Sequence, residues 1–369
     1  MNRTAYTLIG PSLRTSMAWK AKNGKWRRTS ILILVLLSIF YLEFLIYFVQ
    51  AWTWQSLHCP TNSKCTRFLF VADPQILGEL DEPNSITIWD NDRYLHRTFL
   101  LALSHIQPDA VVFLGDLMDE GNRANDFEFQ RYVDRFFNIF PLENVPQSLF
   151  LPGDNDIGGE NGDPILPSVV YRFRHIFHKT KELIVNLCLI LKVNPVLEPM
   201  PRPDPSHVTS EKFIRIGVSH FPLLGMSTPF TEKVLKDFKP HVIFSAHSHL
   251  SRLRGPTMKN PSPLNDMIGP VQLGQVNQTK DKDYEDGWSD GSFNTVQEIE
   301  VPTCSYRMGV YNMGYGYALF DETRKELQYA VLWLPNRLIH LKLYLYMSSC
   351  FGLVFLFWFI CAYGRAHRS

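Results

Sequence analysis

Acidic and histidine side chains follow four apolar segments of the chain, each at the point where the segment stops. The clearest segment, residues 111–114, reads Val-Val-Phe-Leu and is followed at once by Gly115 and Asp116. A short apolar run rich in β-branched and aromatic residues is typical of a strand buried on both faces. The other three segments lead in the same way to Asp73, Asp154, and His247 with His249. Because α/β proteins place metal-binding and catalytic groups at strand ends, this pattern predicts a shared site.

These side chains indicate a metal centre that holds two divalent ions. Carboxylates and imidazoles without cysteine suit Mn²⁺, Fe or Zn²⁺ better than a soft metal. A carboxylate such as that of Asp116 can bridge two ions, and the His247 and His249 rings can each reach a different ion. Two ions about 3.5–4 Å apart can hold the oxygens of a phosphate and activate a water for in-line attack. The predicted ligands are Asp73, Asp116, Asp154, His220, His247 and His249.

The segments between these residues alternate between strand and helix patterns. Apolar residues recur at intervals of three and four in the predicted helices, which are 93–106, 126–140, 169–177 and 231–238. An apolar run occupies 183–193, and further strands are predicted at 213–219, 317–320 and 327–334. The polar stretch 250–291 is expected to be a long surface excursion. The order of patterns predicts an α/β domain with a mixed sheet or two facing sheets.

Two long apolar segments lie near the ends of the chain. Residues 31–51 and 342–363 each approach the roughly 20 residues that cross a bilayer as a helix. A cleaved signal peptide is the alternative for the first segment. However, this segment is longer than the ~7–15 apolar residues of a signal peptide, and about 30 residues precede it. An uncleaved anchor is therefore favoured.

Basic residues flank both apolar segments on their outer sides. The positive-inside rule therefore predicts cytosolic tails at 1–30 and 364–369. It places the linker 52–66 and the domain 67–336 in a lumenal space. Cys59 and Cys65, which could form a short disulfide, and the glycosylation acceptor at Asn277 agree with this orientation. The formal net charge of +1 gives no indication of nucleic-acid binding.

Five motifs occur in the order that defines the calcineurin-like metallophosphoesterases, and from about Arg67 to Leu250 the chain resembles that family. The motifs are Asp73-Pro74-Gln75, Gly115-Asp116-Leu117-Met118-Asp119, Gly153-Asp154-Asn155-Asp156, Ser219-His220 and Ala246-His247-Ser248-His249. The resemblance implies a metal-dependent phosphodiesterase with a four-layer α/β/β/α sandwich, here flanked by two transmembrane helices. It implies one ion on Asp73, Asp116 and His249, and a second ion on Asp116, Asp154, His220 and His247.

The motifs depart from the family pattern at several positions. Gln75 replaces a histidine ligand, which leaves a weak amide contact or a water, and Asp154 replaces an asparagine. Asn155 replaces the histidine that is thought to protonate the leaving alcohol; water, His220, Asp156 or another histidine would have to do so. General acid catalysis typically contributes about 10²–10⁴-fold. Asp119 is expected to support the ligands from behind or to bind metal weakly.

A closer resemblance concerns one branch of the family. Residues 71–75 and 301–309, with an apolar segment at each end, look like the endoplasmic-reticulum metallophosphoesterase 1 family. That resemblance implies an Mn²⁺ enzyme that removes ethanolamine phosphate from the glycan of GPI anchors and so promotes transport of GPI-anchored proteins from the endoplasmic reticulum to the Golgi. It implies residence in membranes of the early secretory pathway. Arg307, in the second of these stretches, is a candidate to hold a substrate phosphate.

Two other functions are compatible with the same residues. The site could act on another lumenal phosphodiester, such as a nucleotide or a phospholipid head group. The chain could also be a non-catalytic metal-binding protein of membrane trafficking, which Gln75 and Asn155 would favour. Six convergent ligands argue against that second alternative, because a scaffold has no physical need for them.

Overall fold

The computed structural model describes residues 29–160, 162–177, 180–197, 203–225, 228–255, 261–273 and 296–366. The predictions for the N-terminal tail up to residue 28, for Asn277 and for residues 367–369 lie outside these ranges. The chain divides into two compact units, Met1–Val49 and Gln50–Ser369, which are considered separately.

Two helices in the described ranges are long and apolar enough to cross a membrane, judged by length and composition. The first is Thr29–Ala51, and it contains the π-helical segment η1 (Tyr41–Leu45) and α2 (Ile46–Ala51). The second is Arg337–Phe357, and it forms most of α9 (Arg337–Ala366). The membrane spans of the sequence analysis therefore coincide with helices, and their insertion stays a prediction.

The first sheet of the larger unit has six strands in the order β10-β13-β12-β1-β2-β3. Three strands are parallel: β1 (Cys65–Val71), β2 (Ala110–Phe113) and β3 (Gln147–Phe150). The remaining strands pair antiparallel: β12 (Gly314–Asp321), β13 (Glu326–Trp333) and β10 (Ile268–Gln272). β2 is wholly buried, and β1 and β3 are buried toward their carboxyl ends, because these strands are covered on both faces.

The second sheet has seven strands in the order β4-β5-β6-β7-β11-β8-β9. Four run parallel: β5 (Cys188–Val193), β6 (Ile214–Ser219), β7 (Val242–Ser245) and β11 (Gln297–Glu300). Antiparallel strands complete the edges: β4 (Glu182–Val185), β8 (Arg252–Arg254) and β9 (Ser262–Pro263). The apolar run 183–193 is thus a hairpin. The polar stretch 250–291 is not only a surface excursion, since its described part supplies β8, β9 and β10.

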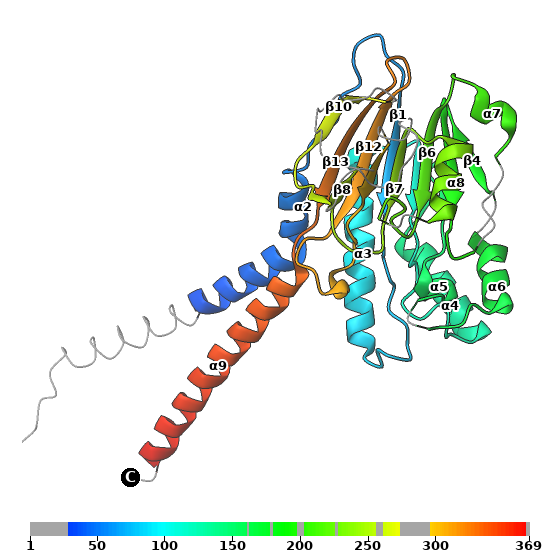
Figure 1. The fold of residues 1–369 in the computed structure, drawn as a ribbon. Helices are drawn as coiled ribbons and strands as arrows, with labels where there is room; N and C mark the ends of the chain where they lie inside the picture. The colour runs from blue at the N-terminus through cyan, green and yellow to red at the C-terminus, as the bar shows by residue number, and fades with distance from the viewer. Residues whose placement is uncertain are drawn as a thin grey trace, which may run out of the picture. The chain divides into compact units, whose positions relative to one another are not determined.

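Helices cover the outer face of each sheet, which gives four layers (Figure 1). α3 (Ser85–Ile106) and α4 (Asp126–Ile139) pack on the first sheet, where Phe99 and Phe136 contact Phe113 of β2. α8 (Pro229–Phe238) covers the second sheet through an apolar cluster with β5 and β7. Between the sheets, Phe70 stacks on Phe244 with ring centroids 4.1 Å apart. The α/β/β/α sandwich is confirmed.

Shorter helices connect these layers: α5 (Asp154–Ile157), α6 (Pro167–Phe177), α7 (Pro205–Thr209) and the 3₁₀ turn η3 (Tyr306–Met308). The helix predicted at 93–106 begins earlier, at Ser85. Asn84 caps it by accepting a hydrogen bond from the backbone N–H of Ile86 at 3.0 Å. The added turns contain polar residues, so apolar spacing alone did not reveal them.

A buried ion pair ties the start of α9 to α3. The Arg337 guanidinium donates to both carboxylate oxygens of Asp90, at 3.0 and 2.6 Å. Tyr306 of η3 donates to the same carboxylate at 3.0 Å, and Arg93 does so at 3.2 Å. Both members of the pair are more than nine-tenths buried. The first turn of α9 is therefore part of the folded domain.

Removal of one member of this pair is expected to destabilise the domain strongly. In Arg337→Met, Asp90 loses its main cationic partner while it stays buried, which we expect to lower the free energy of unfolding by about 3–5 kcal/mol. The double variant Asp90→Asn/Arg337→Met leaves neither charge of the pair and should recover much of this loss. Thermal unfolding of the full chain in detergent measures both. Equal losses in the single and double variants would contradict the explanation by an unpaired charge.

Candidate metal centre

The predicted ligands lie at the carboxyl ends of strands from both sheets. Asp73 and Asp116 follow β1 and β2, and Asp154 is the first residue of α5, just beyond β3. His220 follows β6 and His247 follows β7 in the second sheet. Because the two sheets face each other across the core, the strand ends of one sheet present their side chains to those of the other. The structure thus brings all five residues into one place.

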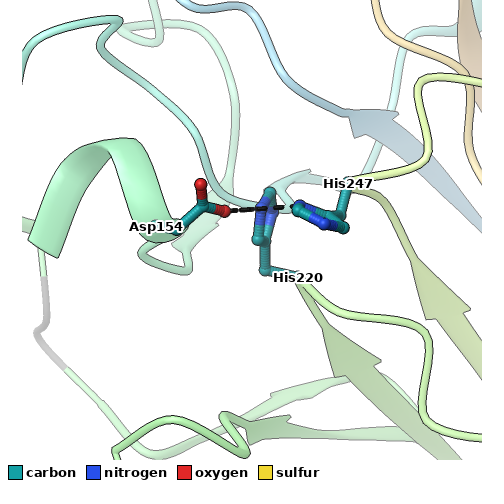
Figure 2. A group of neighbouring side chains, drawn as sticks. All are labelled: Asp154, His220 and His247. Atoms are coloured by element: carbon teal, nitrogen blue, oxygen red, sulfur yellow. Dashed lines mark hydrogen bonds and ion pairs between the residues drawn. The ribbon is translucent and has the colours of Figure 1, made fainter. Parts of the chain in front are cut away.

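Two groups of three side chains have ligand atoms close enough to hold an ion, with all atoms of a group within 4.8 Å of one another. In the first, Asp154 Oδ1 lies 3.1 Å from His220 Nε2 and 3.3 Å from His247 Nδ1 (Figure 2). The second group is Asp73, Asp116 and His220. In the second group, His220 Nε2 lies 3.6 Å from Asp116 Oδ1. His220 is therefore a member of both groups.

His249 lies at the edge of this arrangement. Its Nε2 is 3.8 Å from Asp73 Oδ1, but it belongs to neither group of three among the described residues. Its assignment as a ligand, like the division of the ligands between two ions, stays a prediction.

The ring of His220 has a fixed orientation. Its Nδ1 lies 2.9 Å from the backbone oxygen of Leu114, which can only accept, so Nδ1 carries the hydrogen and donates. Nε2 is then left to face Asp154 and Asp116. A backbone carbonyl behind the ring is the usual support for a metal-binding histidine.

Two amide side chains hold the carboxylate of Asp116. Asn155 donates its backbone N–H to Oδ1 and its Nδ2 to Oδ2, both at 3.0 Å. Gln75 donates its Nε2 to Oδ2 at 2.9 Å. The two residues that depart most from the family motifs are therefore joined through one carboxylate. In this arrangement they orient Asp116.

Asp156 has a different position from that expected of an acid that faces the substrate. Its carboxylate accepts the backbone N–H groups of Gly153, Leu117 and Met118, at 2.9, 3.0 and 3.0 Å. Both oxygens are thus used to join the loops after β2 and β3. Its role as a proton donor stays a prediction that this geometry does not favour.

Burial and crowding shift the pKa values of the acidic groups in opposite directions. Burial raises the pKa of Asp73 to about 7 and also raises that of Asp116. Burial opposes ionisation of Asp154 as well, but hydrogen bonds from His220 and His247 lower its pKa. These carboxylates are packed so closely that a bound cation would stabilise their ionised forms.

The histidines respond to the same surroundings. Burial would lower the pKa of His220, but the neighbouring carboxylates, Asp116 first, raise it to about 10. For His249, burial prevails and lowers the pKa to about 4. The carboxylates around His220 thus favour a positive charge at this centre.

The residues present fit divalent metal ions. Asp73 Oδ2 is buried and has no hydrogen-bond partner among the described residues. Five of the ten described non-glycine residues with positive φ are in the site, at Asp73, Gln75, Asp116, His247 and His249. Left-handed backbone is costly for such residues and concentrates at functional sites. An unsatisfied buried oxygen among strained, oxygen- and nitrogen-rich side chains matches the donor set of Mn²⁺, Fe or Zn²⁺.

Glycine at position 153 is needed for space. A Cβ there would lie 2.1 Å from Asp116 Oδ1 and 2.4 Å from the Asp116 backbone nitrogen. We expect Gly153→Ala to displace Asp116, to lower the free energy of unfolding by about 1–3 kcal/mol and to weaken metal binding at least tenfold. Metal titration and thermal unfolding of the variant measure both effects.

Gly309→Ala is the matched control for Gly153→Ala. Gly309 has φ +69°, but a Cβ there meets nothing within 4 Å. Gly309→Ala should lower the free energy of unfolding by about 1 kcal/mol and leave metal binding unchanged. If Gly153→Ala and Gly309→Ala bound metal equally well, the idea that crowding at Asp116 weakens metal binding would be wrong.

The pocket beside this centre, about 150 Å³ in volume, has residues that the sequence did not reveal. It is lined by Gln75, Asp116, Asp154, Asn155, Glu160, Asp163, His247 and His249. Glu160 Oε1 lies 3.4 Å from His247 Nε2. Glu160 and Asp163 belong to the loop after α5, where the sequence showed only a glycine- and asparagine-rich stretch. Two acidic residues in a loop directly after a predicted ligand were the available signal.

Arg307 and Asp119 are not in the pocket lining, and neither are Asp73, Asp156 and His220. Arg307 pairs with Glu82 at 2.8 Å. Asp119 is partly buried outside both ligand groups, and burial raises its pKa to about 6. A phosphate contact by Arg307 and a metal contact by Asp119 stay predictions.

Residues 66–251 match the family model described as calcineurin-like phosphoesterase. The chain belongs to this family. Cell division control protein 1 of Saccharomyces cerevisiae is 27% identical over 70% of this chain and 55% of its own length. Metallophosphoesterase 1 of Ailuropoda melanoleuca is 30% identical over 37% of this chain and 36% of its own length. Metallophosphoesterase 1 homolog of Drosophila melanogaster is 34% identical over 25% of each chain. The matches thus span about half or less of these relatives.

Proposed function

We propose that this chain is a metal-dependent phosphodiesterase that removes ethanolamine phosphate from the glycan of GPI anchors and so promotes transport of GPI-anchored proteins from the endoplasmic reticulum to the Golgi. The observation that carries the proposal is the convergence of Asp73, Asp116, Asp154, His220 and His247 from five strand ends. Family membership supports a phosphoesterase, and the relatives named metallophosphoesterase 1 support this branch. The substrate rests on the resemblance of the sequence motifs.

The protein supplies the following parts of the reaction. Asp73, Asp116, Asp154 and the histidines would hold two divalent cations, for which Mn²⁺ is our proposal. When bound, these ions supply charge neutralisation for the phosphate and lower the pKa of a water. Leu114 and Asn155 fix the directions of His220 and Asp116, which keeps the ligands in place before substrate arrives. The pocket beside them is the space for the phosphodiester.

The location is part of the proposal. The two apolar helices would anchor the chain, with both tails in the cytosol and residues 67–336 in the lumen of the early secretory pathway. A disulfide joins Cys59 and Cys65, which supports an oxidising compartment. Two anchors would keep the site close to a lipid-linked glycan and raise its effective concentration.

The test is metal content and hydrolysis by the purified full chain in detergent. We expect about two Mn²⁺ ions per chain and hydrolysis of bis-p-nitrophenyl phosphate. His247→Ala should lose both, whereas His175→Ala, on the exposed face of α6, should lose neither. Release of ethanolamine phosphate from a purified GPI glycan then tests the substrate.

Three results would change the proposal. Hydrolysis of the synthetic diester but not of the GPI glycan would indicate another lumenal phosphodiester. Tight metal binding without hydrolysis of any diester would favour a non-catalytic metal-binding protein of membrane trafficking. Absence of bound metal would contradict the metal centre.

A further inference from the structure

The helix α9 leaves the domain at the edge where the metal centre lies, which is formed by the carboxyl ends of the parallel strands. β12 runs antiparallel to both β1 and β13, so β13 runs in the same direction as β1. The end of β13 at Trp333 is therefore on the same edge of the sheet as Asp73. Two strand spacings, roughly 10 Å, separate β13 from β1 in the sheet order. α9 begins four residues after Trp333, and Figure 1 shows it departing from this edge.

The first turns of α3 are fixed against the first turn of α9. Asp90 of α3 forms the buried pair with Arg337, the first residue of α9. A second contact comes from Tyr94, whose hydroxyl donates to the backbone oxygen of Pro335 at 3.0 Å. Together with Tyr306, these contacts leave little freedom for a hinge between the domain and the start of α9.

Large side chains project into solvent beside this junction. Ile86 and Trp89 of α3 are 72% and 60% exposed, and Tyr311 is 58% exposed. Lys342 of α9 places Nζ 3.3 Å from the Tyr311 hydroxyl and 5.3 Å from the ring centroid. These four residues, Ile86, Trp89, Tyr311 and Lys342, are here called the docking edge.

The composition and place of the docking edge fit the head-group layer of a bilayer. Trp and Tyr concentrate at membrane interfaces, and Lys extends its charge from the end of a spanning helix toward head groups. Lys342 is the last charged residue before the uncharged stretch 343–363. It lies five residues after Arg337, which is about 7.5 Å along a helix. The Asp90–Arg337 pair is thus held within about one and a half turns of the apolar stretch.

We propose that the docking edge lies in the lipid head-group layer and holds the metal-centre edge of the domain against the membrane surface. The occupant of this surface is the bilayer that α9 spans, and the inference rests on the membrane anchoring in the proposed function. A phosphodiester carried on a membrane lipid would then meet the site from the side of the bilayer. The buried ion pair makes this orientation a built-in property of the fold.

Depth measurements on the full chain in phosphatidylcholine–phosphatidylserine nanodiscs test the proposal. A fluorophore is attached at Trp89→Cys, with Cys350 and Cys361 replaced by serine; the remaining cysteines are buried or form the Cys59–Cys65 disulfide. Lipids with a nitroxide on the head group should quench this label several-fold more than a label at Arg324→Cys. Arg324 is 53% exposed in the turn between β12 and β13, at the opposite edge of the sheet.

A second variant and a second readout keep the outcome clear. Ile86→Cys, one helical turn from Trp89, should show the same quenching if Trp89→Cys does not fold. Hydrolysis of bis-p-nitrophenyl phosphate is measured on the same samples. Equal quenching at positions 86, 89 and 324 with hydrolysis intact would overturn the docking edge and leave the proposed function standing. Strong quenching at 86 and 89 without hydrolysis would support the docking edge and contradict the enzyme.

Discussion

Asp116→Asn is expected to lower hydrolysis of a phosphodiester by at least roughly 10³-fold, since losing one neutral hydrogen-bond donor at a transition state already costs about 10²–10³-fold. The substitution keeps the size of the side chain and removes its charge. Asp116 is the carboxylate that the sequence predicts to bridge both ions, and it lies 3.6 Å from His220 Nε2. An amide there cannot neutralise a cation, so metal content should fall together with the rate.

Asp119→Asn is the control for this experiment. Asp119 is three residues after Asp116 in the sequence and is also partly buried, but it is outside both ligand groups. We expect metal content to remain and the rate to change by less than about tenfold. If Asp116→Asn retained metal and rate, or if Asp119→Asn lost both, the assignment of the centre would be wrong.

Asn155→His is expected to raise the rate on alkyl phosphodiesters by about 10²-fold, the lower range of general acid catalysis. Asn155 lines the pocket, and its side-chain nitrogen lies 3.0 Å from Asp116 Oδ2. A histidine there would restore the group that the family resemblance assigns to protonation of the leaving alcohol. An alkoxide needs that proton, whereas p-nitrophenolate leaves without it. The rate on bis-p-nitrophenyl phosphate should therefore change little.

The pH profile provides the second test of Asn155→His. A histidine that acts as an acid is active only while protonated, so the gain should be lost as pH rises through its pKa. Asn155→Ala is the matched control, and we expect it to weaken metal binding through loss of one hydrogen bond to Asp116 without a new pH limb. A gain that was equal for alkyl and p-nitrophenyl substrates would show that the new histidine does not protonate the leaving group.

The sequence by itself determined which residue types stand at the strand ends and where strand and helix patterns alternate. An apolar run followed by Gly115 and Asp116 contains, within a few residues, both the strand and the reason that it stops. The helix α4 was predicted to within a residue for a similar reason, because its apolar spacing is local. The capping box at Asn125 and Glu128 that the structure shows is local as well. Such patterns need no information about distant parts of the chain.

The tertiary structure decided which side chains from distant parts of the chain come into contact. Asp73 accepts a hydrogen bond from the backbone of His247, 174 residues later, and Asp90 pairs with Arg337, 247 residues later. Contacts of this kind depend on how the two sheets and α9 come together, and neither partner has a local pattern that identifies the other. For the same reason Glu160 became visible as a neighbour of His247 only in the fold. Residue types and strand ends are local properties, whereas the pairing of strand ends across the core is set by long-range packing.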